Sequence, residues 1–268
     1  MKAQLPGIAL LLLTAFFACD PHPDEPSFGL DCLPAGSLQT GVLAFYPFEN
    51  GNLTDATGNG NDLTNPTTAK PAADRAGNAN CAYRFSNRPT ATEFLTTTQT
   101  AFLNGIKAFS VSLWYQPADS SRESGDYEVL LGRGTGAHCP DRYGEWSVSL
   151  YDCRRAVFGH NNSVWANLVT PQTPDSLCYK EIKALTGVWH HVVAVYNNNT
   201  YKIYFNGVLQ ATETGAADCS SNGHVAQDLG DLFLGTFYTG SIDDVLIYNR
   251  ELSDQEVGAL FNAAPCCY

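Results

Sequence analysis

A short loop rich in side-chain oxygen atoms is the first candidate for chemistry. Between residues 48 and 61 the chain reads FENGNLTDATGNGN, and its oxygen-bearing side chains include those of Glu49, Asn52, Asp55, Asn59 and Asn61. Carboxylate and amide oxygens on a flexible, glycine-rich backbone are the ligands that calcium prefers. Asp and Asn side chains also hydrogen-bond to their own turns. The loop therefore has two interpretations, a calcium site or a set of polar turns.

Aromatic side chains are the second candidate, because a flat ring can stack on the apolar face of a sugar. The candidates lie between residues 133 and 180, a stretch with three cysteines and many Gly and Asn residues, and they are Tyr143, Trp146, Tyr151 and Trp165. We interpret this stretch as a disulfide-linked elaboration of a sheet edge or its loops. Buried aromatics also fill the interiors of β-sandwiches, so the alternative places both Trp side chains in the core.

Carboxylates and histidines offer no catalytic arrangement. Glycoside hydrolysis needs two carboxylates about 5 to 10 Å apart, and alternate residues of a strand share a face. Around Glu128, and again at Asp243 and Asp244, only one acid can point to a given face. His190 and His191 are adjacent, so on a strand they point to opposite faces and cannot bind one metal ion. We therefore predict a protein that is not an enzyme, with structural histidines.

Charge and composition limit the partners and the fold. The 268 residues contain 15 Lys and Arg against 27 Asp and Glu, a formal net charge of -12. No basic surface is available to neutralise nucleic-acid phosphates, so nucleic acid is excluded as a partner. Twenty-three Gly, 14 Pro and a single Met favour a β protein rich in turns over a helical bundle.

The N-terminal segment is typical of export. A positive Lys2 precedes an apolar stretch at residues 5–18 (LPGIALLLLTAFFA) that ends directly before Cys19. The stretch is shorter than the roughly 20 residues that span a bilayer, so we predict a signal peptide at residues 1–18. The run FFAC resembles the lipobox of bacterial lipoproteins, which implies lipidation of Cys19. Ordinary cleavage, leaving one unpaired thiol, is the alternative.

The cysteines also favour an oxidising compartment. Without Cys19, an even set remains that can form four disulfides: Cys32, Cys81, Cys139, Cys153, Cys178, Cys219, Cys266 and Cys267. Eight cysteines allow 105 pairings, so their connectivity stays open. Residues 19–40 begin with the cysteine whose lipidation the lipobox resemblance implies, and the acidic, Pro-rich composition of this segment predicts a flexible tether.

The pattern of the remaining chain, residues 41–268, is typical of one β domain. Apolar residues alternate with polar ones at 109–115 (FSVSLWY), and 189–205 contains two apolar runs separated by an Asn-rich turn. Asn206-Gly207 is a strong hairpin signal. Ser253 and Glu256 form a capping-box pattern. We predict an antiparallel all-β domain with one short C-terminal helix.

Five stretches, found in order between Gly41 and Asn262, resemble the LamG-like jelly-roll domains of the concanavalin A-like lectin/glucanase superfamily. They are GVLAFYPFENGNLTDATGNGNDLT, the Gly-Asn-Ala at 77–79, FSVSLWYQP, GVWHHVVAVYNNNTYKIYFNG and GSIDDVLIYNRELSDQEVGALF. The resemblance implies a sandwich of two antiparallel sheets in a jelly roll. It also implies that the first and last strands lie side by side.

The resemblance extends the calcium interpretation. Related domains often hold a structural calcium between the opening loop and the closing segment, which implies that Asp243 or Asp244 joins the loop. The predicted metal set is therefore Glu49, Asn52, Asp55 and Asp243, and its role would be to join the two ends of the domain. In the alternative, Asp243 only caps a strand.

The functional expectation also rests on this resemblance. It implies a recognition domain whose ligand is a glycan. The N-terminal residues add the expectation that the domain is exported and lipid-anchored to the bacterial cell envelope, and the stacking argument makes Tyr143, Trp146 and Trp165 the candidate ligand-binding residues. Because the superfamily includes lectins, enzymes and interaction domains, fold alone does not decide the function. A protein-binding or structural envelope module is the alternative, and a glycoside hydrolase is a third. Membrane contact is expected through the N-terminal lipid only.

Overall fold

The computed structural model describes most of the predicted domain. The described residues are 29–34, 36–87, 93–118, 127–134, 146–151, 153–159, 164–165, 175–215 and 230–267. The predicted signal peptide and Cys19 lie outside them. Among the described helices, none has the length and apolar character needed to cross a bilayer.

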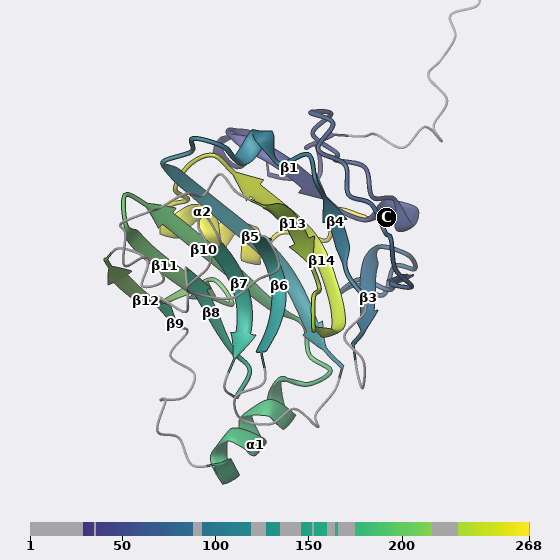
Figure 1. Ribbon diagram of the computed structural model, residues 1–268, viewed down its shortest axis with the longest axis vertical. Coiled ribbons are helices and arrows are strands. Elements are labelled where there is room, and N and C mark those ends of the chain that lie inside the picture. The colour runs from purple at the N-terminus through teal and green to yellow at the C-terminus, as the bar shows by residue number, and fades with distance from the viewer. Residues whose placement is uncertain are drawn as a thin grey trace, which may run out of the picture.

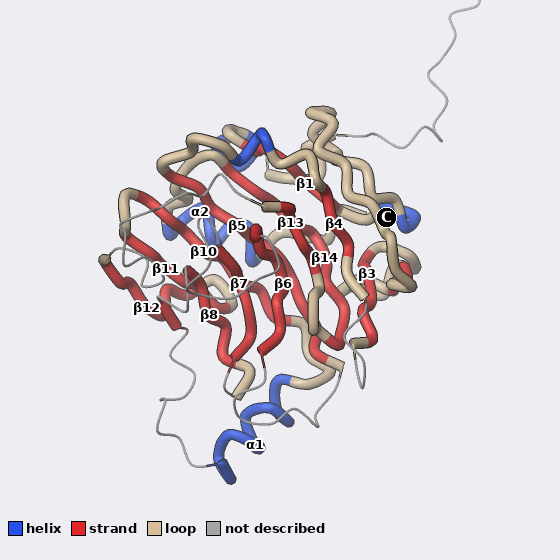
Figure 2. Tube along the Cα trace, in the orientation of Figure 1, coloured by secondary structure: helices blue, strands red, loops and turns tan. Residues whose placement is uncertain are grey.

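Within the described residues, fourteen strands form two antiparallel sheets (Figures 1 and 2). The first sheet has the order β12-β11-β10-β5-β14-β3-β2, with β1 also paired to β14. Its strands are β1 (Val42–Tyr46), β2 (Lys70–Ala72), β3 (Ala82–Ser86), β5 (Ala108–Pro117), β10 (His190–Asn197), β11 (Thr200–Phe205), β12 (Val208–Thr214) and β14 (Thr239–Tyr248). The predicted hairpin at 189–205 is the β10-β11 pair, in which Asn197 faces Thr200.

The second sheet has the order β4-β13-β6-β7-β8-β9. Its strands are β4 (Leu95–Thr97), β6 (Tyr127–Gly134), β7 (Trp146–Tyr151), β8 (Arg155–Gly159), β9 (Val164–Trp165) and β13 (Asp231–Leu234). The stretch predicted as an elaboration of a sheet edge supplies β7, β8 and β9, which form one side of this sheet. The predicted all-β, two-sheet antiparallel sandwich is confirmed.

The first and last strands lie side by side, as predicted. β1 pairs antiparallel with β14, so that Val42 faces Tyr248 and Tyr46 faces Val245. The two ends of the domain are therefore joined by a ladder of backbone hydrogen bonds.

The central strands of the eight-stranded sheet are buried on both faces. In β14, Val245 and Ile247 belong to the large core between the sheets, whereas Leu246 and Tyr248 belong to a second core on the opposite face. The sequence of a strand that is covered on both faces is a continuous run of apolar residues, which explains the apolar run in β10. The second core also contains Val257.

The helix α2 (Asp254–Phe261) covers this second core. Its N-cap Ser253 accepts a hydrogen bond from the Glu256 backbone, and the Glu256 side chain returns to the Ser253 backbone, which confirms the predicted capping box. Val257 and Leu260 point into the core.

Two features differ from expectation. A second helix, α1 (Asp175–Leu185), lies at the lower end of the molecule in Figure 1. Of its described side chains, Ile182 and Leu185 are buried. These two residues give only a weak helical pattern in a segment rich in polar residues. Part of the predicted tether is folded, because Leu33 and Leu38 pack in the second core.

Candidate functional site

Asp55 organises the opening loop. Its Oδ1 accepts hydrogen bonds from the Phe45 backbone at 3.0 Å, the Thr57 backbone at 3.0 Å and the Thr57 hydroxyl at 2.7 Å, and its Oδ2 accepts one from the Asn61 backbone at 3.2 Å. Asp55 is only 1% exposed. The carboxylate thus holds its own turn against β1, as the polar-turn interpretation expects.

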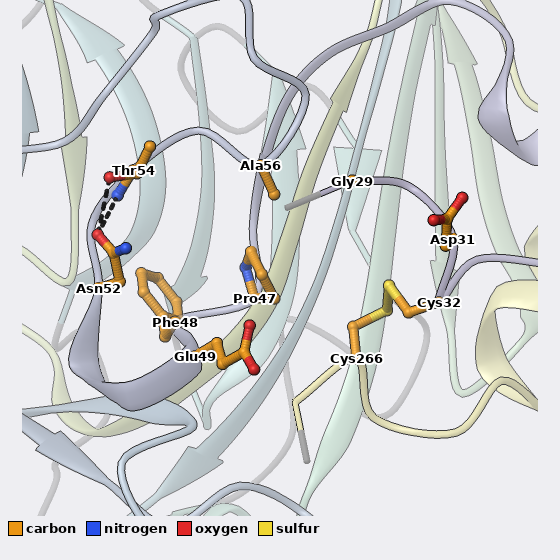
Figure 3. A pocket seen from close by; sticks show the side chains of 10 residues that line it. All are labelled: Gly29, Asp31, Cys32, Pro47, Phe48, Glu49, Asn52, Thr54, Ala56 and Cys266. Carbon is orange, nitrogen blue, oxygen red and sulfur yellow. Dashed lines mark hydrogen bonds between the residues drawn. A yellow bond between two sulfur atoms is a disulfide. The ribbon is translucent and has the colours of Figure 1, made fainter. Parts of the chain in front are cut away.

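Glu49 and Asn52, from the same loop, line a pocket of about 160 Å³, which we call the opening pocket (Figure 3). Its lining residues are Gly29, Asp31, Cys32, Pro47, Phe48, Glu49, Asn52, Thr54, Ala56 and Cys266. The disulfide between Cys32 and Cys266 lies between the Glu49 and Asp31 side chains in Figure 3. The pocket therefore joins the two ends of the described chain.

The backbone beside the opening pocket is held in an unusual conformation. Phe48 and Asn50 have φ values of 56° and 54°, in the left-handed region that an aromatic residue rarely adopts. The Phe48 ring is fully buried and packs edge-on against Tyr83, with centroids 5.2 Å apart. Next to them, Gly51 has φ 74°, and a Cβ there would lie 2.6 Å from Pro71. Such strained residues often cluster at ligand sites.

The polar groups of the opening pocket are available to a ligand. Neither the Asp31 nor the Glu49 carboxylate accepts a hydrogen bond from the described residues. Asn52 uses its Oδ1 to accept from the Thr54 backbone at 2.9 Å and the Thr54 hydroxyl at 2.8 Å, which leaves its amide nitrogen to donate outward. The lining contains no Lys or Arg. The pocket can therefore accept hydrogen bonds from hydroxyl or ammonium groups, and it disfavours anions.

Asp243 lies apart from the opening loop's turn network, in an ion-paired cluster. Asp243 and Asp244 both bind Nη1 of Arg75, at 2.8 and 2.6 Å. Burial, and then the neighbouring Asp244 carboxylate, raise the pKa of Asp243, while Arg75 opposes the shift. Both carboxylates are buried.

The predicted calcium set does not fit a shared ion. Asp55 is saturated by its own loop and Asp243 is paired with an arginine, while Glu49 and Asn52 face the opening pocket. Within the described ranges, no group of three or more His, Cys, Asp or Glu residues could hold a metal ion. Calcium binding by this chain stays a prediction.

Several disulfides are formed. Cys32 pairs with Cys266 and Cys81 with Cys267, with Cα atoms 5.2 and 5.6 Å apart, and Cys153 is also disulfide-bonded. Cys139, Cys219 and the side chain of Cys178 lie outside the part of the chain that the structure describes. Disulfides form and persist in oxidising compartments, which indicates an exported protein.

Trp146 does not fit the predicted ligand-stacking role. Its side chain is 2% exposed and packs in the core between the sheets, with its ring centroid 5.0 Å from that of Phe109. Trp165, in β9, pairs with Val157 of β8. The Trp165 side chain is outside the described set. Tyr143 also lies outside the described residues.

The outer face of the same strands carries a tyrosine that is accessible in part. Tyr151, Ser149 and Ser147 alternate with the core residues of β7, and Tyr151 faces Tyr127 of β6. The two tyrosine rings are 6.2 Å apart, and the Tyr127 hydroxyl lies 2.8 Å from that of Ser147 and 3.0 Å from that of Ser149. This face is a second surface with aromatic and hydroxyl groups.

The remaining candidate acids and histidines are interior residues. Glu128 binds Nε of Arg154 at 3.2 Å, with both side chains buried. His191 lies 2.9 Å from the Ser112 hydroxyl, and burial lowers its pKa to about 3. His190 points to the opposite face and contacts the Leu185 carbonyl. These contacts match the structural roles predicted for the histidines.

Solved structures with a similar fold have distant sequences. Domain 4 of an extracellular arabinanase from Geobacillus stearothermophilus, solved with arabinotriose, is 19% identical with a TM-score of 0.56, covering 82% of this chain and 98% of that one. The binding domain of botulinum neurotoxin DC, solved with SialylT, is 14% identical with a TM-score of 0.60. The match covers 84% of this chain and 52% of that one.

A third structure, the binding domain of Paraclostridial Mosquitocidal Protein 1, is 17% identical with a TM-score of 0.58, covering 84% of this chain and 52% of that one. This chain thus spans about half the length of both toxin domains. At these identities the likeness establishes the fold. No curated protein matches the sequence.

The family is established by sequence. A model described as the concanavalin A-like lectin/glucanases superfamily matches residues 89–258, more than half of the chain. Those residues include β5, β10, β11 and β14, the central strands of the eight-stranded sheet. The chain belongs to the concanavalin A-like lectin/glucanase superfamily.

Proposed function

We propose that this protein is a non-catalytic recognition domain that binds a carbohydrate in the opening pocket. The observation that carries the proposal is the pair of carboxylates, Asp31 and Glu49, that face this pocket without hydrogen-bond partners among the described residues. Carboxylate oxygens accept hydrogen bonds strongly, and a sugar presents several hydroxyl donors. Asn52 adds an amide donor to the same site.

The size of the opening pocket limits the ligand. Its volume of about 160 Å³ is below the roughly 300 to 1,000 Å³ of typical small-molecule pockets. One sugar ring or the end of a glycan chain fits such a space better than a long internal segment. Because the Cys32–Cys266 disulfide and the buried Phe48 ring fix its walls, little ordering is needed on binding.

The fold supports the same class of function. The arabinanase domain was solved with arabinotriose and the neurotoxin domain with SialylT. Among the described residues, the buried acids Glu128, Asp243 and Asp244 are held in ion pairs with Arg154 and Arg75, so these three are not free to act as a general acid and base. This supports recognition over hydrolysis.

A glycan array tests the proposal, followed by calorimetric titration of the best ligand. Glu49→Gln should weaken binding by about tenfold or more, because a hydrogen bond to a charged group is lost. Glu213→Gln, which makes the same chemical change at an exposed position on β12, is the matched control and should bind as the unmodified protein does.

Three results would overturn the proposal. Binding that survives Glu49→Gln but disappears in Tyr151→Ala would move the site to the outer face of β7. An array without any bound glycan would favour a protein-binding or structural envelope module. Release of reducing sugar from a bound polysaccharide would make the protein a glycoside hydrolase.

We also propose that the chain is exported and anchored to the bacterial cell envelope by a lipid on Cys19. The disulfides and the apolar stretch before Cys19 support this proposal. Expression of Cys19→Ala should release the protein from the membrane fraction, and intact mass should show the loss of acyl chains. A mass difference equal to the exchange of Cys for Ala alone would rule out the lipid.

A further inference from the structure

Arg75 lies where two acidic residues, the second core and the C-terminal tail meet. Its Nη1 donates to the Oδ2 atoms of Asp243 and Asp244 at 2.8 and 2.6 Å, and its Nη2 donates to the Ala263 carbonyl at 3.3 Å. The guanidinium also lies over the Trp114 ring, 4.6 Å from its centroid. One side chain therefore contacts β14, β5 and the tail after α2.

A distortion of β14 brings the two carboxylates together. Consecutive residues of a regular strand point to opposite faces, but the register of β14 against β5 shifts between Asp243 and Leu246. Asp244 adopts φ 45° at this point, which Asp tolerates better than most residues. Such a bulge turns a side chain away from its usual face, so both acids reach the same guanidinium.

The cluster is almost completely buried. The side chains of Asp243, Asp244 and Arg75 are 0%, 7% and 10% exposed. Burying charges of this kind is costly unless a counter-charge is present. The Oδ1 atoms of both acids have no hydrogen-bond partner among the described residues, so Arg75 is the counter-charge in direct contact with them.

The same cluster holds the end of the chain. The Cys266 backbone N–H points to Oδ2 of Asp244 at 3.4 Å. Beside Arg75, Asn78 donates to the Cys267 carbonyl at 3.0 Å and to Asp74 at 2.9 Å. The loop that carries Arg75 thus ties the C-terminal tail to the closing strand.

We propose that the Arg75 guanidinium is the built-in cation that ties the closing strand β14 and the C-terminal tail to the loop after β2, at the acidic pair where the family resemblance places calcium. A guanidinium bonded to both carboxylates repels a metal ion from the same position, because the two positive charges would lie in direct contact. Without Arg75, four carboxylate oxygens, two of them already without partners, would face a buried space. The chain without this arginine should therefore take up a divalent cation there.

Thermal unfolding with added calcium or with a chelator tests this proposal. The unmodified protein should have the same Tm under both conditions. Arg75→Met should lower the Tm by roughly 10 °C or more in chelator, since two buried charges lose their partner, and added calcium should restore part of the loss. Arg75→Lys, which keeps the charge, should show a smaller loss and no calcium response.

A variant without charges covers the case in which Arg75→Met does not fold. Combining it with Asp243→Asn and Asp244→Asn removes the uncompensated charges, so this triple variant should fold and ignore calcium. A Tm of the unmodified protein that falls on chelation would overturn the proposal. So would an Arg75→Met protein with an unchanged Tm, or one that calcium does not stabilise. None of these outcomes depends on glycan binding.

Discussion

Two groups of acidic residues lie on either side of Cys266 and have opposite environments. Asp31 and Glu49 face the opening pocket without partners among the described residues, whereas Asp243 and Asp244 are buried on Arg75. Cys266 lines the pocket and also directs its backbone N–H toward Asp244. Burial therefore decides the role of an acidic residue. A buried carboxylate needs a fixed counter-charge, whereas an accessible carboxylate can bind a ligand.

Removing the disulfide that the two groups share should have the largest effect. The Cys32–Cys266 bond closes a loop with a sequence separation of 234, so Cys32→Ser with Cys266→Ser should lower the free energy of unfolding by about 5 kcal/mol. It should also weaken glycan binding, because one wall of the opening pocket is released. Denaturant unfolding without reductant and calorimetric titration measure the two effects.

The second disulfide provides the matched control. Cys81→Ser with Cys267→Ser opens a bond with a separation of 186 and should cost a similar free energy of unfolding. Neither cysteine lines the opening pocket, so binding should persist. Equal loss of binding in both double variants would erase the distinction between the two regions.

Neutralising the two pairs of acidic residues should give the next largest difference in the free energy of unfolding. Asp243→Asn with Asp244→Asn leaves the Arg75 guanidinium without a charged partner, and we expect a loss of roughly 3–5 kcal/mol in the free energy of unfolding. Asp31→Asn with Glu49→Gln should change it by no more than about 1 kcal/mol while weakening ligand binding. Denaturant unfolding compares the two variants, and equal losses would contradict the roles assigned here.

A smaller effect concerns pH and the helix that covers the second core. Hydrogen bonding to Arg250 lowers the pKa of Glu256 to about 2. A depressed folded-state pKa means that the group adds stability above its unfolded pKa of about 4.3, and this is lost as the pH falls toward 2. Glu256→Gln should remove this part of the acid dependence, as measured by Tm between these values. An unchanged acid profile would show that the ion pair contributes nothing.

Much of the fold could be predicted because period-two alternation and turn residues act locally. The β10-β11 hairpin and the capping box at Ser253 and Glu256 are examples. The helix α1 was missed because, of its described side chains, only Ile182 and Leu185 are buried, which leaves a weak apolar pattern in the sequence. Burial of Leu33 and Leu38 was also missed, since most of the second core comes from residues far along the chain, as in the hydrogen bond from the Tyr248 hydroxyl to the Leu38 carbonyl.

The candidate site was harder to predict from the sequence than the fold was. Glu49 and Asn52 were found, with a different role proposed for them, but Asp31 was assigned to the tether. Its place at the opening pocket depends on the Cys32–Cys266 pairing, which cysteine spacing cannot give.

The choice between aromatic residues could have been made from the sequence. In β7, Trp146 alternates with Ser147 and shares its face with apolar residues, whereas Tyr151 shares the polar face. Applying the alternation rule to this strand would have assigned Trp146 to the core and Tyr151 to the surface.

The bond between Cys32 and Cys266 makes nearly the whole domain a covalent ring. A single proteolytic cut in any loop between these residues would open the ring without separating two fragments. Cleaved molecules would keep their mass under non-reducing conditions and run as two pieces only after reduction. For a domain exposed to proteases outside the cell, damage to one loop would leave every strand attached.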